Sequence, residues 1–369
     1  MKKDLFVPQS ENAIKVYEQQ NAIKKDWTLS RYYITKDYFN THMKQFVAKA
    51  GDLIVSCAGT IGEVYELPKD AEEGVFNQAL MRVRVNNEIV NKEIFITVFS
   101  SMIDKFSKIY SNGSAIKNIP PFADLKRTQV YLPCKEEQIV IAQLLRSLDE
   151  RIATQSKIID KLQSLIKGIM VELQKQGVNK GTWKKVFLSD VLTERNERNT
   201  DLFQVFSVSV SQGVVNQVDY LGRSFAAKDT SKYNVVHYGD LVYTKSPTGS
   251  FPYGIVKQSL NLENVAVSPL YGVYKPKSLA VGAYLHEYFM SEINTHNYLH
   301  PLIQKGAKNT INITNQRFLE NRVLLPINTN ELLLISKLLR SLNNKIKYQQ
   351  DILQQYQKQK QYLLRQMFI

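Results

Sequence analysis

An internal repeat constrains this chain more than any other feature of its sequence. The segments Gly113–Pro133 (GSAIKNIPPFADLKRTQVYLP) and Gly306–Pro326 (GAKNTINITNQRFLENRVLLP) have the same length, begin with Gly and end with Leu-Pro. Two shorter matches keep the same order: Leu-Leu-Arg-Ser-Leu at 144–148 and 338–342, and Gly-Asp-Leu at 51–53 and 239–241. The offsets lie between 188 and 194 residues, which is far too long for a solenoid. We therefore expect a duplicated unit, in which a globular part is followed by a helix.

Each copy ends in a segment with the periodicity of a coiled-coil helix. Apolar residues recur at alternating steps of three and four, which places them along one seam. The seam residues are Leu145, Leu148, Ile152, Gln155 and Ile159 in the first copy and Leu339, Leu342, Ile346, Gln349 and Leu353 in the second. A lone helix of about 30–40 residues, about 45–60 Å long, would expose this seam, so we expect the two helices to pair.

One polar residue interrupts each seam at the same register, Gln155 in the first copy and Gln349 in the second. A polar residue in an apolar seam lowers stability but fixes the register of pairing. The alternative is that each Gln side chain turns to solvent at the edge of its helix.

The globular parts mix short strands with helices. In the first part we expect strands at 52–57, 63–67 and 81–85 and a helix at 91–110; in the second part we expect strands at 203–215, 240–245 and 269–274 and a helix at 280–300. Gly177, Asn179 and Gly181 supply the stop signal of the first helix. The predicted fold class is α+β, with globular domains at 1–135 and 178–326 and helices at 136–177 and 327–369.

Charge and composition restrict the class of protein. The chain of 369 residues carries a formal charge of +14, with 26 basic and 21 acidic residues up to Lys180 (+5) and 22 basic and 13 acidic residues after it (+9). A basic protein with 20 Tyr and 16 Phe favours a nucleic-acid partner, and the alternative is a solvated basic surface. Two cysteines, no signal peptide and no apolar stretch of about 18 residues predict a protein of the reducing cytoplasm that does not enter a membrane.

The sequence does not predict a catalytic centre. Asn118–Phe122 (NIPPF) resembles the Asn-Pro-Pro-aromatic loop of amino-methyltransferases, but Ile119 separates the Asn from the first Pro. Gly59–Gly62 follows a strand, but the residues after it alternate like another strand, whereas a donor-binding turn needs a helix there. The run Lys245–Ser250 lacks the spacing of a phosphate loop. We therefore expect no enzyme activity and no cofactor.

A metal site is not predicted either. His296 and His300 are four residues apart on an expected helix, with His286 and Glu292 nearby, but no Cys joins them. Such residues are more often ordinary helix side chains than zinc ligands.

Basic, polar and aromatic residues gather in the expected loops. Arg, Lys, Asn and Gln read base edges, whereas Lys, Ser and Thr hold phosphates, and aromatic rings stack. The candidate DNA-binding residues are Lys24, Lys25, Arg31, Tyr32, Ser114 and Lys117 in the first unit and Arg195, Arg198, Arg223, Lys245, Ser246, Thr248, Tyr253, Lys305, Lys308 and Asn309 in the second. A solvated loop is the alternative for any one of them.

Together these features resemble the specificity (S) subunit of type I restriction-modification systems. The resemblance rests on the duplication, on Gly51–Ser56 with Gly59–Gly62, on Asn77–Leu80, on the Leu-Pro step into Glu136–Gln138, and on the closing Leu-Leu-Arg-Gln-Met-Phe-Ile. It implies two target recognition domains, each reading one half of a bipartite site in double-stranded DNA. It also implies that the helices form an antiparallel coiled coil that docks methyltransferase (M) subunits, that restriction (R) subunits join for cleavage, and that the S subunit itself is not catalytic.

The first unit departs from the family pattern. By the repeat offset Met1 aligns near Ser189, so this unit has no counterpart of Thr182–Leu188, with which the family usually begins both units. Two alternatives stay open: the sequence starts late, or this member of the family has a shortened first recognition domain. Two other functions stay open: a DNA adenine methyltransferase with a fused recognition domain, which would bind a labelled methyl donor, and a coiled-coil assembly scaffold, which would not bind DNA.

Overall fold

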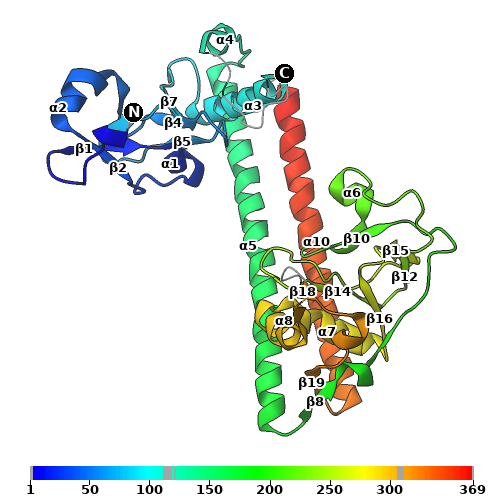
Figure 1. The fold of residues 1–369 in the computed structure, drawn as a ribbon. Coiled ribbons are helices and arrows are strands. Elements are labelled where there is room, and N and C mark those ends of the chain that lie inside the picture. The colour runs from blue at the N-terminus through cyan, green and yellow to red at the C-terminus, as the bar shows by residue number, and fades with distance from the viewer. Residues whose placement is uncertain (1–2, 111–118, 120–121, 306–310, 368–369) are drawn as a thin grey trace. The chain divides into compact units, whose positions relative to one another are not determined.

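A computed structural model describes residues 3–110, 119, 122–305 and 311–367 of the chain. The chain forms two compact units (Figure 1). Unit 1 comprises Met1–Ile152 together with Gln355–Ile369, and unit 2 comprises Ala153–Gln354. The expected mixture of helices and short strands is confirmed in both units.

Unit 1 contains two small sheets. Strand β1 (Ala13–Tyr17) lies between β2 (Tyr32–Thr35) and β6 (Gly74–Phe76), and β3 (Val47–Ala48) extends this sheet beyond β6. In the second sheet β4 (Leu53–Ser56) is central, with β5 (Val64–Glu66) and β7 (Leu80–Val83) antiparallel on its two sides. The remaining elements are α1 (Gln19–Lys24), α2 (Lys36–Tyr38), η2 (Phe39–Met43), η3 (Lys44–Phe46), η1 (Lys3–Leu5), α3 (Lys92–Tyr110), α4 (Phe122–Arg127) and the start of α5 (Lys135–Asn179). The strands β4, β5 and β7 confirm the three that the sequence predicts here.

Unit 2 is larger and has one more strand in the equivalent sheet. Its order is β14 (Val256–Gln258), β13 (Leu241–Tyr243), β16 (Gly272–Pro276) and β9 (Leu192–Glu194). Four two-stranded sheets accompany it: β8 (Trp183–Phe187) with β19 (Arg322–Pro326), β12 (Asn234–Val236) with β15 (Val265–Val267), β10 (Phe206–Ser209) with β11 (Gly213–Asn216), and β17 (Gln304–Lys305) with β18 (Ile311–Asn312). The helices are α6 (Gln217–Leu221), α7 (Leu279–Met290), α8 (Glu292–Leu299), α9 (Asn315–Phe318), η4 (Leu188–Asp190), η5 (His300–Leu302) and the start of α10 (Thr329–Met367).

The repeated Gly-Asp-Leu forms the same turn in both units. Gly51 and Gly239 have φ values of 83° and 90°, a left-handed conformation that favours Gly. The Asp that follows is buried, and its carboxylate accepts a backbone N–H three residues upstream, from Lys49 at 3.1 Å and from His237 at 2.9 Å. The turn therefore delivers the Leu directly into the central strand of each sheet.

The two long helices contribute to the core of each unit. In unit 2, residues Ile159, Ile166 and Met170 of α5 share one apolar cluster with Leu339 and Ile346 of α10. The Gln155 side chain is 8% exposed and donates to the backbone oxygen of Gln349 at 3.3 Å, so it is buried and does not turn to solvent.

Unit 1 holds the other ends of the two helices. There Leu364 packs on a cluster that includes Ile94, Ala142 and Leu145, and Lys360 donates to Asp149 at 2.5 Å. In unit 1, therefore, residues early in α5 contact residues late in α10, whereas in unit 2 residues later in α5 contact residues early in α10.

Three sequence-based boundaries are wrong. The expected strand 203–215 is a β10–β11 hairpin, because Gly213 turns with a φ of 76° and pairs with Ser209. The expected helix 280–300 is two helices, because Ser291 adopts an extended conformation and its side chain caps α8 at Asn294. The first helix ends at Asn179, two residues beyond the expected boundary, and Gly177 lies inside it beneath the Trp183 ring, where a Cβ would not fit.

Candidate nucleic-acid interface

Four of the candidate DNA-binding residues lie in one loop of unit 2, between β13 and β14. Lys245 has a φ of 61°, and the loop closes through two backbone hydrogen bonds of 3.0 Å between Thr248 and Phe251. Phe251 is buried beneath it, while Ser246 is exposed. Burial lowers the pKa of Lys245, and the nearby Glu194 carboxylate opposes that shift. The geometry is that of a rigid loop that presents a half-buried cation beside exposed hydroxyl groups.

An aromatic group on α8 faces the same loop. The Tyr253 ring centroid lies 5.2 Å from that of His296 and 6.0 Å from that of His300, and the two His rings stack at 5.3 Å. The Ser250 hydroxyl donates to the Glu292 carboxylate. The two His side chains are exposed. From the sequence alone, this His pair was considered only as a set of metal ligands. Its i, i+4 spacing was the available sign that both side chains would lie together beside one loop.

Arg195 is engaged inside unit 2. Its guanidinium donates to both oxygens of Asp240, at 2.6 and 3.0 Å, and approaches Glu197 at 3.4 Å. Only 18% of its side chain and 2% of that of Asp240 are exposed. Burial of the guanidinium and its bonds to Asp240 act in opposite directions, and the net effect raises the pKa of Arg195. This pair supports the Gly-Asp-Leu turn.

The other two candidate arginines of unit 2 contact amide oxygens or an aromatic ring. Arg198 is exposed and donates to the Asn234 side chain at 2.6 Å and to the Lys232 backbone oxygen at 2.9 Å. The Arg223 guanidinium lies 4.5 Å from the centroid of the exposed Phe225 ring. Neither belongs to the loop that holds Lys245, so the structure brings together only part of the predicted set.

In unit 1 the candidates lie on α1 and at the start of β2. Lys24 and Arg31 are exposed, and the Arg31 guanidinium lies 5.0 Å from the Tyr32 ring centroid. The Lys25 ammonium donates to the Glu63 carboxylate at 2.9 Å and to the Val64 backbone oxygen at 2.6 Å. Lys25 is therefore less available than its neighbours to a phosphate.

Several predicted residues cannot be placed. Ser114, Lys117, Lys308 and Asn309 lie outside the described residues, as do Asn118, Pro120 and Pro121 of the NIPPF motif. For Lys305 only the backbone is described, in β17. The Gly59–Gly62 run lies in the loop between the antiparallel strands β4 and β5, so a strand follows it, as predicted.

Comparison with known proteins gives a family for the first part of the chain. Residues 7–164 match the model of the type I restriction modification DNA specificity domain. This segment is therefore similar to the type I restriction modification DNA specificity domain. The match includes the first globular part and most of the first long helix, as the resemblance from the sequence predicts.

Two solved structures of type I systems share the fold. The crystal structure of a type I restriction-modification S subunit from M. genitalium is 12% identical, with a TM-score of 0.56 over 100% of this chain and 91% of that chain. A second structure, described as the structural basis underlying complex assembly and conformational transition of the type I R-M system, is 13% identical, with a TM-score of 0.52 over 99% and 95%. At these identities the likeness is one of fold, and it extends over both units.

The two long helices carry a repeated apolar surface. In unit 1 the exposed fractions are 46% for Ile139, 64% for Val140 and 44% for Leu144. The residues 194 positions later, in unit 2, are Leu333 (44%), Leu334 (67%) and Leu338 (45%). We call these two sets the outer apolar faces. Exposed apolar residues that recur at the repeat offset indicate a binding surface rather than scattered surface hydrophobics.

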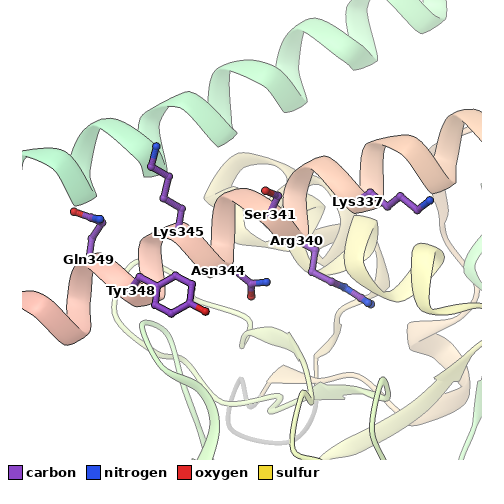
Figure 2. Close-up of a pocket in the computed structure, with 7 residues that line it drawn as sticks. All are labelled: Lys337, Arg340, Ser341, Asn344, Lys345, Tyr348 and Gln349. Carbon is purple, nitrogen blue, oxygen red and sulfur yellow. The ribbon is translucent and has the colours of Figure 1, made fainter.

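A basic groove of about 460 Å³ continues the second outer apolar face along α10 (Figure 2). Its lining residues are Lys337, Arg340, Ser341, Asn344, Lys345, Tyr348 and Gln349. The first copy differs at the same positions: Gln143 replaces Lys337, Glu150 replaces Asn344, and Arg146 forms an ion pair with Glu93. The second copy is therefore the more basic of the two at this surface.

Two further observations concern the described residues alone. No three His, Cys, Asp or Glu side chains lie close enough together there to bind a metal ion. None of the helices in this part of the chain is both long and apolar enough to span a bilayer.

Proposed function

We propose that this chain is the non-catalytic DNA specificity subunit of a type I restriction-modification complex in the cytoplasm. Each unit would contribute one target recognition domain, and together they would read a bipartite site in double-stranded DNA. The observation that carries the proposal is the repeat of a turn and a helix. The turn is Gly-Asp-Leu with its buried Asp, and the helix seam holds the paired Gln155 and Gln349. The first part of the same chain matches the specificity-domain family model.

The recognition surface of unit 2 would be the loop that holds Lys245, Ser246, Thr248 and Tyr253. Lys and hydroxyl groups contact phosphates, and the rings of Tyr253, His296 and His300 offer a stacking surface. In unit 1, Arg31 and Tyr32 would play this part. The charge of +14 supports binding to a polyanion.

The helices would form an antiparallel coiled coil that separates the two recognition domains and docks the partners. The contacts of Gln155 with Gln349 and of Asp149 with Lys360 support this pairing. Each outer apolar face would bind one methyltransferase (M) subunit, because the two faces are equivalent in sequence. Restriction (R) subunits would then join the complex for cleavage.

DNA binding tests the recognition part of the proposal. The chain with its M subunits is titrated into a labelled duplex that carries the bipartite site, and the titration is repeated over a range of salt concentrations. We expect specific binding whose affinity falls steeply with salt, because basic side chains displace counterions from phosphates. Binding that does not depend on salt, or that is equal for a duplex with both half-sites scrambled, would contradict the assignment.

Single-charge variants test the docking part. We expect that the wild-type chain binds two M subunits, that Val140→Lys and Leu334→Lys each bind one, and that the double variant binds none, as measured by native mass spectrometry. Tyr362→Lys is the matched control, because Tyr362 is 63% exposed on α10 outside the outer apolar faces. Two bound M subunits on the double variant would overturn the docking assignment.

A further inference from the structure

One face of α10 in unit 2 carries positive charge that no carboxylate of the unit offsets. Lys337, Arg340 and Lys345 line the basic groove of Figure 2. Lys337 and Lys345 are exposed, and Arg340 is partly exposed. None of the ion pairs in the described part of the chain involves any of these three side chains. The three cations are therefore available to an anionic partner.

The exposed leucines of the second outer apolar face lie on the same side of the helix. Leu333 precedes Lys337 by four residues and Leu338 precedes Lys345 by seven, and both spacings repeat on one face of an α-helix. Leu334 belongs to the same patch and is 67% exposed. A partner that covers this face must therefore bury leucine side chains and supply anions at the same time.

The first copy has the same apolar patch, but its cations are engaged within unit 1. Arg146, the counterpart of Arg340, forms an ion pair with the Glu93 carboxylate. Arg151 is the counterpart of Lys345, and its guanidinium carbon lies 5.8 Å from the centroid of an aromatic ring of α10. These two side chains are thus less available than their counterparts in unit 2.

Two further positions shift the charge in the same direction. Gln143 stands where the second copy has Lys337, and Glu150 stands where it has Asn344. The two copies therefore present similar apolar patches beside different charges. An anionic partner meets an attraction in the second copy that the first copy does not supply.

We propose that the groove of α10 binds an acidic amphipathic helix of a partner protein, and that the corresponding face of α5 lacks this preference. The inference rests on the docking proposal above, in which the partner on each outer apolar face is an M subunit. Apolar residues of the partner helix pack on the leucines. Its carboxylates, about two turns apart, meet Lys337 and Lys345, which are about 12 Å apart along α10.

DNA is the weaker occupant of this surface. Phosphates would pair with the cations but would leave the three leucines exposed to water. A protein partner covers both parts of the surface. Since salt screens pairs of exposed charges but does not weaken apolar packing, the two docking faces should differ most at low salt.

Variants with one docking face each measure this difference on the full chain. Val140→Lys leaves only the face in unit 2 open, and Leu334→Lys leaves only the face in unit 1 open. Fluorescence anisotropy gives the dissociation constant of a labelled M subunit for both, at about 0.1 M and about 1 M NaCl, where the screening length is about 10 Å and about 3 Å. We expect Val140→Lys to bind the M subunit about tenfold more tightly than Leu334→Lys at the lower salt, and less than about threefold more tightly at the higher salt.

Removal of charge assigns the difference to the groove. In the Val140→Lys chain, Lys337→Gln combined with Lys345→Gln should weaken binding of the M subunit about fivefold at the lower salt. The matched control combines Lys161→Gln with Lys167→Gln, which removes the same charge from two exposed lysines of α5 in unit 2. The control pair should change the affinity less than about twofold. Circular dichroism verifies that each variant is folded.

Three results would overturn the inference. The first is equal affinity with equal salt dependence for the two single-face variants. The second is a loss of affinity with the control pair as large as that with the groove pair. The third is a groove pair that weakens DNA binding and leaves the affinity for the M subunit unchanged, because the groove would then contact phosphates. None of these three contradicts docking itself, whereas failure of both single-face variants to bind any M subunit would contradict the docking proposal and this inference with it.

Discussion

The two copies of the repeat share a turn and a helix, but they cover their sheets differently. In unit 2, Trp183–Glu194 pairs with two strand edges, and residues of the sheet, α7, α8 and both long helices join one large cluster, while Val242 and Val273 of the same sheet belong to a second cluster. In unit 1 the buried apolar residues form four separate clusters around the two sheets, α3 and the helix ends. The comparison teaches that the buried turn and the helix seam are common to the two units, although the strands around their sheets differ.

The same turn is also held by different means in the two copies. Asp240 binds Arg195, which follows β9, whereas Asp52 binds Arg84 at 2.9 Å, just after β7. Arg84 is 57% exposed, but Arg195 is only 18% exposed. The Asp therefore keeps its place in the turn of both units, although its Arg partner follows β9 in unit 2 and β7 in unit 1.

The largest effect should come from removing the buried Trp183 ring. Trp183→Ala should destabilise unit 2 by about 3–5 kcal/mol, because it empties a packed site under the ring. Tyr131→Ala, in unit 1, should change stability by less than about 0.5 kcal/mol, because that ring is exposed. Urea unfolding with amide exchange resolved for each unit measures both values. A loss of similar size for the two variants would show that burial of the ring does not set the difference.

Removing the Asp of the Asp–Arg pair should also cost more stability in unit 2 than in unit 1. Asp240→Asn should cost about 2–3 kcal/mol, because it leaves a largely buried guanidinium without its carboxylate. Asp52→Asn should cost about 1 kcal/mol, since Arg84 reaches solvent. Thermal melts of the two variants compare them directly. Equal losses would mean that the turn itself, and not the burial of the cation, sets the energy.

The two copies agree in the helix seam. Substitutions at the contact between Gln155 and Gln349 test this part of the comparison. Gln155→Leu should cost about 1–2 kcal/mol, because it leaves the Gln349 amide without its partner. The double change to Leu should restore that loss or exceed the wild type, because an apolar pair fits the seam. Urea unfolding of the two single variants and the double variant gives the coupling energy. Additive losses would show that the two side chains do not interact.

The smallest expected effect is a dependence of the stability of unit 2 on pH in the acid range. Burial, with the Lys257 ammonium nearby, lowers the pKa of His286 from 6.5 to about 3, and His286 Nδ1 accepts the Gln258 amide at 3.0 Å. Below pH 6.5 the unfolded chain therefore takes up a proton that the folded unit does not. Stability should fall with decreasing pH from 6.5 toward 3, by about 1 kcal/mol at pH 5.5.

His286→Asn should remove this dependence, and the exposed His42 of unit 1 serves as the control through His42→Asn. The raised pKa of the buried Glu287 acts with the opposite sign in the acid range, so the comparison with the variant isolates the His term. Denaturant melts at pH 7.0 and 5.5 provide the measurement. A pH slope that is unchanged in His286→Asn would contradict the assignment.

Repetition and periodicity were enough to predict several individual elements of this chain. The strand after Gly51-Asp52 and the register of the seam follow from local patterns, and the structure has β4 and the Gln155 contact where they were expected. The breaks at Gly213 and Ser291 were missed, because a glycine turn and a serine cap interrupt patterns that otherwise continue. The packing of Trp183 over Gly177 is a tertiary contact, which local patterns do not show.

The candidate site was harder to predict from composition. The expected strand 240–245 ends at Tyr243, so Lys245 lies in the loop that follows it. Composition cannot tell a free cation from a structural one. Arg195 and Lys25 have the same residue type as their neighbours and differ only in the carboxylates that the fold brings to them, Asp240 and Glu63. The stacking of Tyr253 with His296 likewise depends on the packing of a loop against α8.

The central claim, that each unit reads its own half of a bipartite site, has one direct test. Residues 182–326 are replaced by the corresponding globular part of another specificity subunit, with α5 and α10 left intact, and the methylome of cells that carry the chimera and its M subunits is mapped. The account predicts that one half of the methylated site changes while the other half and the spacer length persist. A change in both halves, or an unchanged site with methylation retained, would contradict it.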